Sequence, residues 1–152
     1  MIPGRLLAAG VIAAMLPDLD VIGLRLGIGY GSQFSHRGFT HSLLFAAALA
    51  LAGASLHRRL RAGFACAFVF LFAALASHGL LDAFTNGGSG IAFLWPFSDA
   101  RYFAPWRPVE VSPLGIRGFF TARGVEVLKS EVIWIWCPLF LAAALFAIRR
   151  RR

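Results

Sequence analysis

The sequence predicts an all-α integral membrane protein, a small helical bundle with three spanning helices, a short N-terminal helix and a long aromatic loop. Of its 152 residues, 59% are hydrophobic and 14% are charged, whereas about 25% of the residues in soluble domains are charged. The mean hydropathy is +0.72, so lipid is the expected solvent for much of the chain. The length suits one domain, and we expect residues 1–152 to form a single membrane-embedded domain.

Three apolar runs are the predicted spans. They cover residues 39–56, 62–81 and 132–148, and a helix needs about 20 apolar residues to cross a hydrocarbon core of about 30 Å. The first and third runs are slightly short, so they would extend into the interface or thin the bilayer. A further apolar run, 6–16, is too short to span alone. No small-residue cleavage site follows it, which favours a partial helix over a signal peptide.

The last two predicted spans are separated by a long connection, residues 86–131. It carries four prolines and eight aromatic residues. Aromatic side chains gather where a membrane meets water, so we expect this connection to lie at the interface. From there it could cover a site as a lid.

The basic residues form clusters beside the apolar runs. Eight of the fifteen lysines and arginines lie at Arg5, at Arg58, Arg59 and Arg61, and in the C-terminal run 149–152. Such clusters typically anchor a membrane protein, and they do not line a groove, so no nucleic-acid partner is expected. Cys66 and Cys137 lie inside apolar runs and are expected to be buried free thiols.

The order of the apolar runs gathers the polar motifs on one side. The basic turn 57–61 must share a side with the C-terminal arginines, and the opposite side receives PDLD (17–20), HRGFTH (36–41) and HGLLD (78–82). Positively charged loops stay in the cytoplasm. The polar motifs are therefore expected at the periplasmic, outer face of a bacterial inner membrane.

Two pairs of residues within these motifs have spacings that suit metal binding. His78 and Asp82 are four residues apart, so on a helix they share a face and could hold one ion. His36 and His41 are five residues apart, and Gly38 between them allows one on a loop and the other in a first helical turn. A simple ion pair or a satisfied interfacial histidine is the alternative for each. Ionisable groups at membrane depth usually mark function.

Asp18 and Asp20 follow Pro17 and complete a set of six candidate ligands. A solvated pair of aspartates at a helix end is the alternative. Imidazole together with carboxylate suits zinc, with manganese as the second choice. Six ligands exceed what one tetrahedral zinc ion needs, so the set predicts one or two divalent ions. A pair about 3.5–4 Å apart would use all six and would support phosphoester hydrolysis.

Arg37 and Thr40 are the predicted substrate contacts of a catalytic site. An arginine matches a phosphate group with two parallel hydrogen bonds, although contact with a lipid headgroup is an equal alternative for Arg37. Further candidates for supporting or substrate contacts are Ser42, Thr85, Arg101 and Arg107.

The motifs LPDLD, HRGFTHS, SHGLLDAFTNGG and LWPFSDARYFAPW, in this order, resemble the YdjM-like inner-membrane metal-dependent hydrolases. That family is distantly similar to zinc-dependent phospholipase C and to the zinc single-strand nucleases. The resemblance covers nearly the whole chain and implies a helical, hydrolase-like domain. The ligands that it implies are Asp18, Asp20, His36, His41, His78 and Asp82. It also implies an upstream histidine on a preceding apolar helix, and because this chain has no histidine before His36, one metal position is expected to lack a ligand.

The resulting hypothesis is a membrane-bound metal-dependent hydrolase, a phosphoesterase acting on a lipid or lipid-linked phosphate at the bilayer surface. A divalent-metal transporter could use the same ligands, but the middles of the three predicted spans (45–53, 66–74 and 136–145) contain no acidic residue and no histidine. A non-catalytic membrane protein with a structural metal is the other alternative. Structural zinc sites usually have four protein ligands, so six candidates favour catalysis.

Overall fold

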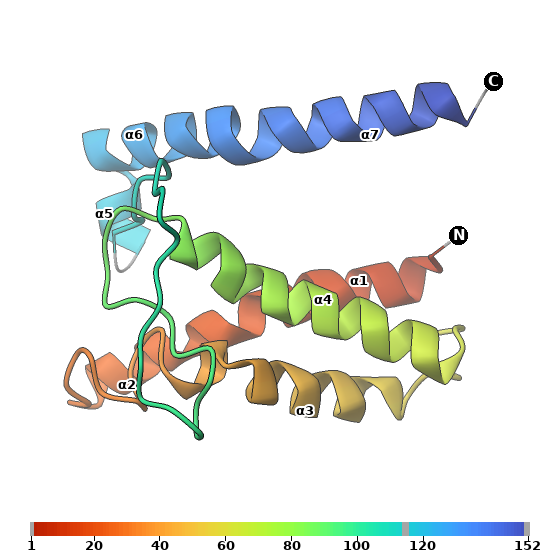
Figure 1. Cartoon of the computed structure of the whole chain (residues 1–152), viewed down its shortest axis with the longest axis horizontal. Coiled ribbons are helices and arrows are strands. Elements are labelled where there is room, and N and C mark those ends of the chain that lie inside the picture. The colour runs from red at the N-terminus through yellow and green to blue at the C-terminus, as the bar shows by residue number, and fades with distance from the viewer. Residues whose placement is uncertain (1, 114–115, 151–152) are drawn as a thin grey trace. The chain divides into compact units, whose positions relative to one another are not determined.

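A computed structural model describes residues 2–113 and 116–150, and the regular secondary structure in this part of the chain is helical, with two isolated β-bridges and no strand (Figure 1). The chain divides into two compact units. Unit 1 comprises Met1–Ala83 and Ser89–Ala104, and unit 2 comprises Phe84–Gly88 and Pro105–Arg152. The predicted all-α fold class is confirmed, since three helices are long and apolar enough to cross a membrane.

The first helical segment of unit 1 extends beyond the predicted run 6–16. Helix α1 (Gly4–Met15) leads into the 3₁₀ turn η1 (Leu16–Asp20) and the short helix α2 (Val21–Arg25). Pro17 is accommodated because it takes the first turn of η1, where no backbone N–H is needed. The whole segment Gly4–Arg25 has 22 residues and is long enough to span.

Helix α3 is shorter than the predicted run 39–56. It covers Leu43–Ala54, 12 residues, or about 18 Å at 1.5 Å per residue. Its start is fixed by Ser42, whose extended backbone and side-chain oxygen, accepting from the Phe45 N–H at 3.1 Å, form an N-cap. The preceding residues form a separate 3₁₀ turn, η2 (Phe39–His41). The short apolar helix of unit 1 is thus α3 and not the N-terminal segment.

Helix α4 (Phe64–Ala83) is the centre of unit 1, and both α1 and α3 pack against it. The contact is close, because a Cβ atom on Gly53 would lie 2.6 Å from Leu71 Cδ1 and one on Gly10 would overlap the Phe70 ring. Small residues commonly allow such helix contacts in membranes. The buried core is Leu6, Ala13, Ala46, Ala50, Ala54, Ala67, Leu71 and Leu75.

Helices α1 and α4 run in the same direction, and α3 runs opposite to both. Arg5 Nη1 donates to the Arg59 carbonyl at 3.2 Å, so α1 begins beside the basic turn that joins α3 to α4. The C-terminal end of α1, the start of α3 and the C-terminal end of α4 therefore lie at the opposite end of the unit. These three ends carry the polar motifs.

Unit 2 contains α5 (Ile116–Phe119), α6 (Ala122–Glu131), the π-helical turn η3 (Val132–Trp136) and α7 (Cys137–Arg149). The continuous segment Ala122–Arg149 could span a membrane, and it begins ten residues before the predicted run 132–148. Its apolar side chains are largely exposed, as expected where lipid is the solvent.

Both cysteines are exposed, so the prediction that they are buried is wrong. Cys66 lies on α4 and Cys137 at the start of α7, each on an apolar helix. A small apolar side chain on a membrane helix can face lipid at no cost in free energy. Its apolar surroundings in the sequence are therefore no reason to expect burial within the protein.

Candidate metal centre

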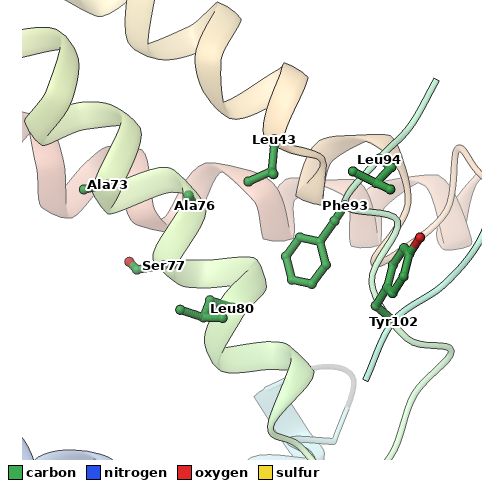
Figure 2. Close-up of a pocket in the computed structure, with 8 residues that line it drawn as sticks. All are labelled: Leu43, Ala73, Ala76, Ser77, Leu80, Phe93, Leu94 and Tyr102. Atoms are coloured by element: carbon green, nitrogen blue, oxygen red, sulfur yellow. The ribbon is translucent and has the colours of Figure 1, made fainter. Parts of the chain in front are cut away.

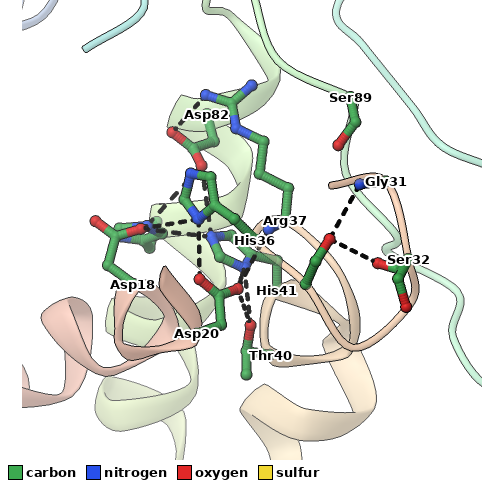
Figure 3. A network of polar contacts seen from close by, with 12 residues as sticks. Asp18, Asp20, Gly31, Ser32, His36, Arg37, Thr40, His41, Asp82 and Ser89 are labelled. Carbon is green, nitrogen blue, oxygen red and sulfur yellow. Dashed lines mark hydrogen bonds and ion pairs between the residues drawn. The ribbon is translucent and has the colours of Figure 1, made fainter. Parts of the chain in front are cut away.

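The structure brings the six predicted ligands into one cluster in unit 1 (Figure 3). Two come from η1, one from the loop after α2, one from η2, and two from the last turns of α4. In that order they are Asp18, Asp20, His36, His41, His78 and Asp82.

Four of the six form an inner set around a common point. One ligand atom from each of Asp18, His41, His78 and Asp82 lies within 4.8 Å of the others. Asp18 Oδ1 is 3.1 Å from His78 Nε2 and 3.7 Å from His41 Nε2. Asp82 Oδ2 is 3.5 Å from His41 Nε2 and 4.0 Å from His78 Nε2. Ligands held at about 2.0–2.2 Å from a tetrahedral ion lie about 3.3–3.6 Å apart, so the inner set has the spacing that a single ion requires.

The His41 ring gives a second sign of a missing partner. Its side chain is fully buried, yet Nε2 has no hydrogen-bond partner among the described residues. A buried polar atom without a partner is costly. This nitrogen faces the oxygens of Asp18 and Asp82 at distances longer than hydrogen bonds, so a divalent cation fits between them.

Asp20 is bound differently from the inner set. Its side chain is only 2% exposed, and it contacts His36 Nδ1 at 2.9 Å and His41 Nδ1 at 3.2 Å. The Thr40 hydroxyl donates to it at 2.5 Å and the Arg37 backbone N–H at 3.2 Å. Asp20 therefore ties the HRGFTH segment to η1 and fixes both imidazole rings.

Gly38 allows this segment to fold tightly. A Cβ atom there would overlap the Gln33 carbonyl and lie 2.7 Å from the Ser35 carbonyl. The Gly38 φ of −85° is ordinary, so the requirement is close backbone approach and not a left-handed conformation. The expected placement of His36 on the loop and His41 in the first turn is what the structure has, with that turn being η2.

Arg37 lies inside the cluster. Its backbone is left-handed, with φ 67°, its side chain is 3% exposed, and Nη2 is 3.3 Å from Asp82 Oδ1. The predicted substrate contact is therefore already paired with an inner-set carboxylate. A phosphate bound next to Asp82 would meet the same guanidinium.

The cluster carries net negative charge when the imidazoles are neutral. The carboxylates of Asp18, Asp20 and Asp82 are in contact with the rings or with the single guanidinium of Arg37. Three negative charges and one positive charge leave two negative charges in a partly buried space. Such a charge requires either protonated imidazoles or a cation.

The other candidate side chains have structural partners or lie elsewhere. Arg101 donates to the carbonyls of Gly31, Ser32, Arg37 and Gly90 and to the Ser89 hydroxyl, at 2.8–3.2 Å. Partial burial lowers its pKa from the usual value, but an arginine remains charged. Ser42 caps α3. Thr85 and Arg107 belong to unit 2.

The first part of the predicted aromatic loop is hydrogen-bonded to segments that carry or adjoin the cluster. Residues 89–104 belong to unit 1, where the Ala92 N–H donates to the Arg37 carbonyl at 3.2 Å and the Leu43 N–H to the Phe93 carbonyl at 3.0 Å. Ile91 and Ala92 are fully buried. This part of the loop forms a wall behind HRGFTH.

An apolar cavity of about 430 Å³ borders the cluster at Asp20 and Thr40. Its remaining walls come from η1, α2, the loop before η2, η2 itself and α3, and they are Leu16, Leu19, Gly23, Phe34, Phe39, Phe45 and Leu49. The sequence did not reveal it, because its lining comes from five segments without a shared motif. Such a space suits a hydrocarbon chain and not a polar molecule.

A second apolar cavity, of about 530 Å³, lies on another face of α4 (Figure 2). Ala73, Ala76, Ser77 and Leu80 line it, and this spacing places them on one side of the helix. His78 and Asp82 lie on a different side. This cavity is therefore separated from the cluster by the helix itself.

Comparison with known proteins agrees with a helical protein embedded in a membrane. The sequence matches the family described as YdjM inner membrane protein over residues 2–152. It is 47% identical over 152 residues to the inner membrane protein YbcI of Escherichia coli (strain K12), covering 99% of this chain and 88% of that protein. No solved structure matches significantly. The chain therefore belongs to the YdjM inner membrane protein family.

Proposed function

We propose that this protein is a membrane-bound metal-dependent hydrolase, a phosphoesterase acting on a lipid or lipid-linked phosphate. The observation that carries the proposal is the inner set of Asp18, His41, His78 and Asp82, whose ligand atoms all lie within 4.8 Å of one another, with carboxylate-to-imidazole distances of 3.1–4.0 Å, around the buried His41 Nε2. Two imidazoles and two carboxylates suit zinc, with manganese as the alternative.

Asp18, His41, His78 and Asp82 would hold a divalent ion, and that ion would supply the Lewis acidity that polarises a phosphoryl oxygen and activates water. The surrounding residues supply the rest. Arg37, 3.3 Å from Asp82, neutralises charge on a phosphate next to it, and Thr40 holds Asp20 and the His41 ring in place. Asp18 is 53% exposed on its side chain, so one edge of the site is open to a substrate, unlike a closed structural zinc site.

A lipid substrate is favoured by the surroundings of the site. The cavity that ends at Asp20 and Thr40 is otherwise apolar, and the helices around it belong to an inner-membrane protein. An acyl chain could occupy this cavity while the headgroup phosphate meets the inner set. Because the basic turn and the C-terminal arginines favour the cytoplasmic side, we assign the site to the periplasmic face.

The test uses detergent-purified protein and two single substitutions, His78→Ala and Asp82→Ala. Each removes one ligand and should abolish both bound divalent metal, measured by mass spectrometry, and hydrolysis of a panel of phospholipids, lipid phosphates and lipid diphosphates. His57→Ala is the matched control, because His57 lies in the basic turn and contacts the Ala62 carbonyl. Unchanged metal stoichiometry in the two ligand variants would contradict the proposal.

A further inference from the structure

Asp18 and Asp20 are two residues apart, yet the structure gives them opposite environments. The Asp18 side chain is 53% exposed and the Asp20 side chain is 2% exposed. Asp18 Oδ1 points at the Nε2 atoms of His41 and His78. Asp20 contacts Nδ1 atoms instead. The two carboxylates therefore address different sides of the imidazole cluster.

The acceptor capacity of Asp20 is filled by protein donors. Oδ1 accepts from His36 Nδ1, while Oδ2 accepts from the Arg37 N–H and the Thr40 hydroxyl and lies 3.2 Å from His41 Nδ1. A carboxylate offers about four lone-pair positions. Three hydrogen-bond donors and the His41 ring surround these positions, whereas Asp18 contacts the Nε2 atoms of the inner set and has a half-exposed side chain.

These contacts also fix the histidine tautomers. His36 Nδ1 donates to Asp20, and His41 Nδ1 donates to the Thr40 oxygen, whose own proton goes to Asp20. Each Nδ1 therefore carries the proton, and the lone pair of each ring lies on Nε2. For His41 this is the buried nitrogen that lacks a partner among the described residues. Asp20 thereby presents His41 Nε2 to the inner set. A carboxylate that orients a metal-binding histidine from behind is a common arrangement in zinc sites.

We propose that the centre holds one divalent ion, on Asp18, His41, His78 and Asp82, and that Asp20 is a positioning residue and not a ligand. The charge agrees, because the two net negative charges of the cluster balance one divalent ion, and a second ion would leave the partly buried site positive. The inference rests on the proposed function only in requiring that the cluster binds metal.

The experiment is metal titration of the purified full chain, with cobalt(II) and zinc(II) as probes and bound metal measured by native mass spectrometry. The wild type should bind one ion per chain. Asp20→Asn should still bind one ion, with a dissociation constant raised about 10- to 100-fold, as expected for loss of an orienting carboxylate. His78→Ala should bind none. Asp99→Asn, at an exposed position in the loop, is the matched control and should bind as the wild type does.

Thr40→Val provides a second variant in case Asp20→Asn does not fold. It removes one donor to Asp20 and the hydrogen bond to His41 Nδ1 but none of the four ligand side chains, so it should keep one ion with a dissociation constant raised severalfold. Two ions per wild-type chain, or a folded Asp20→Asn variant that binds no metal, would overturn the one-ion assignment while leaving the proposed hydrolase standing. A folded wild type that binds no ion would instead overturn the proposed function itself.

Discussion

Arg37 combines a strained backbone with a buried, charge-paired side chain. Its left-handed φ of 67° costs a non-glycine residue about 1 kcal/mol or more, and its guanidinium is held against Asp82. Strain of this kind persists where the surrounding contacts impose it. At the residue scale, the question is whether Arg37 supports the Asp82 carboxylate or contacts the substrate.

We expect Arg37→Ala to keep the bound metal and to lower kcat/KM for a phosphate ester about 10- to 100-fold. The reason is that hydrogen bonds to charged groups contribute about 1.5–3 kcal/mol. Arg61→Ala is a matched control, because Arg61 also has a left-handed backbone, with φ 58°, and lies exposed in the basic turn. Metal loss in Arg37→Ala but not in Arg61→Ala would make Arg37 a support of Asp82 and not a substrate contact.

At the scale of elements, the HRGFTH segment depends on its glycine. Gly38→Ala should lower the melting temperature and weaken metal binding at least tenfold, because the new Cβ would overlap the Gln33 carbonyl and push His36 and His41 out of place. Thermal unfolding in detergent and cobalt titration would measure both effects. Gly29→Ala is the control in the same loop, since a Cβ there meets nothing within 4 Å. Equal behaviour of the two variants would rule out the close-approach explanation.

Helix α3 depends on its cap. Ser42→Ala should lower the free energy of unfolding by about 1 kcal/mol, because it leaves the Phe45 N–H without its acceptor. Ser55→Ala is the comparison at the other end of α3. Ser55 is the C-cap residue, and its exposed hydroxyl donates to the Ala52 carbonyl, where water can take its place, so its removal should change stability by less than about 0.5 kcal/mol. Since His41 directly precedes the cap, Ser42→Ala should also weaken metal binding slightly.

At the scale of the whole molecule, composition and apolar runs were enough to predict an all-helical membrane protein, and the order of the runs predicted that the three polar motifs meet. The lengths of individual helices were less predictable. Pro17 looked like the end of the first apolar run, 6–16, which was expected to be too short to span, but a 3₁₀ turn continues the helical segment through Asp20 into α2. Ser42, inside an apolar run, is the true start of α3. Both depend on local hydrogen bonds that hydropathy does not report.

The site was predictable as a set of residues and not as an arrangement. The spacing of His78 and Asp82 on α4 fixes that pair from the sequence alone. The different surroundings of Asp18 and Asp20 arise from how η1 meets the loop before η2, which involves donors such as Thr40 and the Arg37 backbone. These contacts join segments about 20 residues apart, so no local pattern encodes them.

The orientation of the protein follows from charge and can be tested on the same chain. The start of α1 lies beside the basic turn, through the contact of Arg5 with Arg59. The cluster of candidate ligands lies at the other end of the unit 1 helices. Positive residues favour the cytoplasmic side, so the cluster should face the periplasm.

We therefore expect a cysteine at position 29, beyond α2, to react with a membrane-impermeant maleimide in intact cells, in a background in which Cys66 and Cys137 are replaced by alanine. Gly29→Cys places the thiol on the cluster side, at an exposed position, and Arg59→Cys places it in the basic turn, also exposed. The second should react only after the inner membrane is permeabilised. The reverse pattern would put the metal centre in the cytoplasm, where a periplasmic lipid headgroup could not be its substrate.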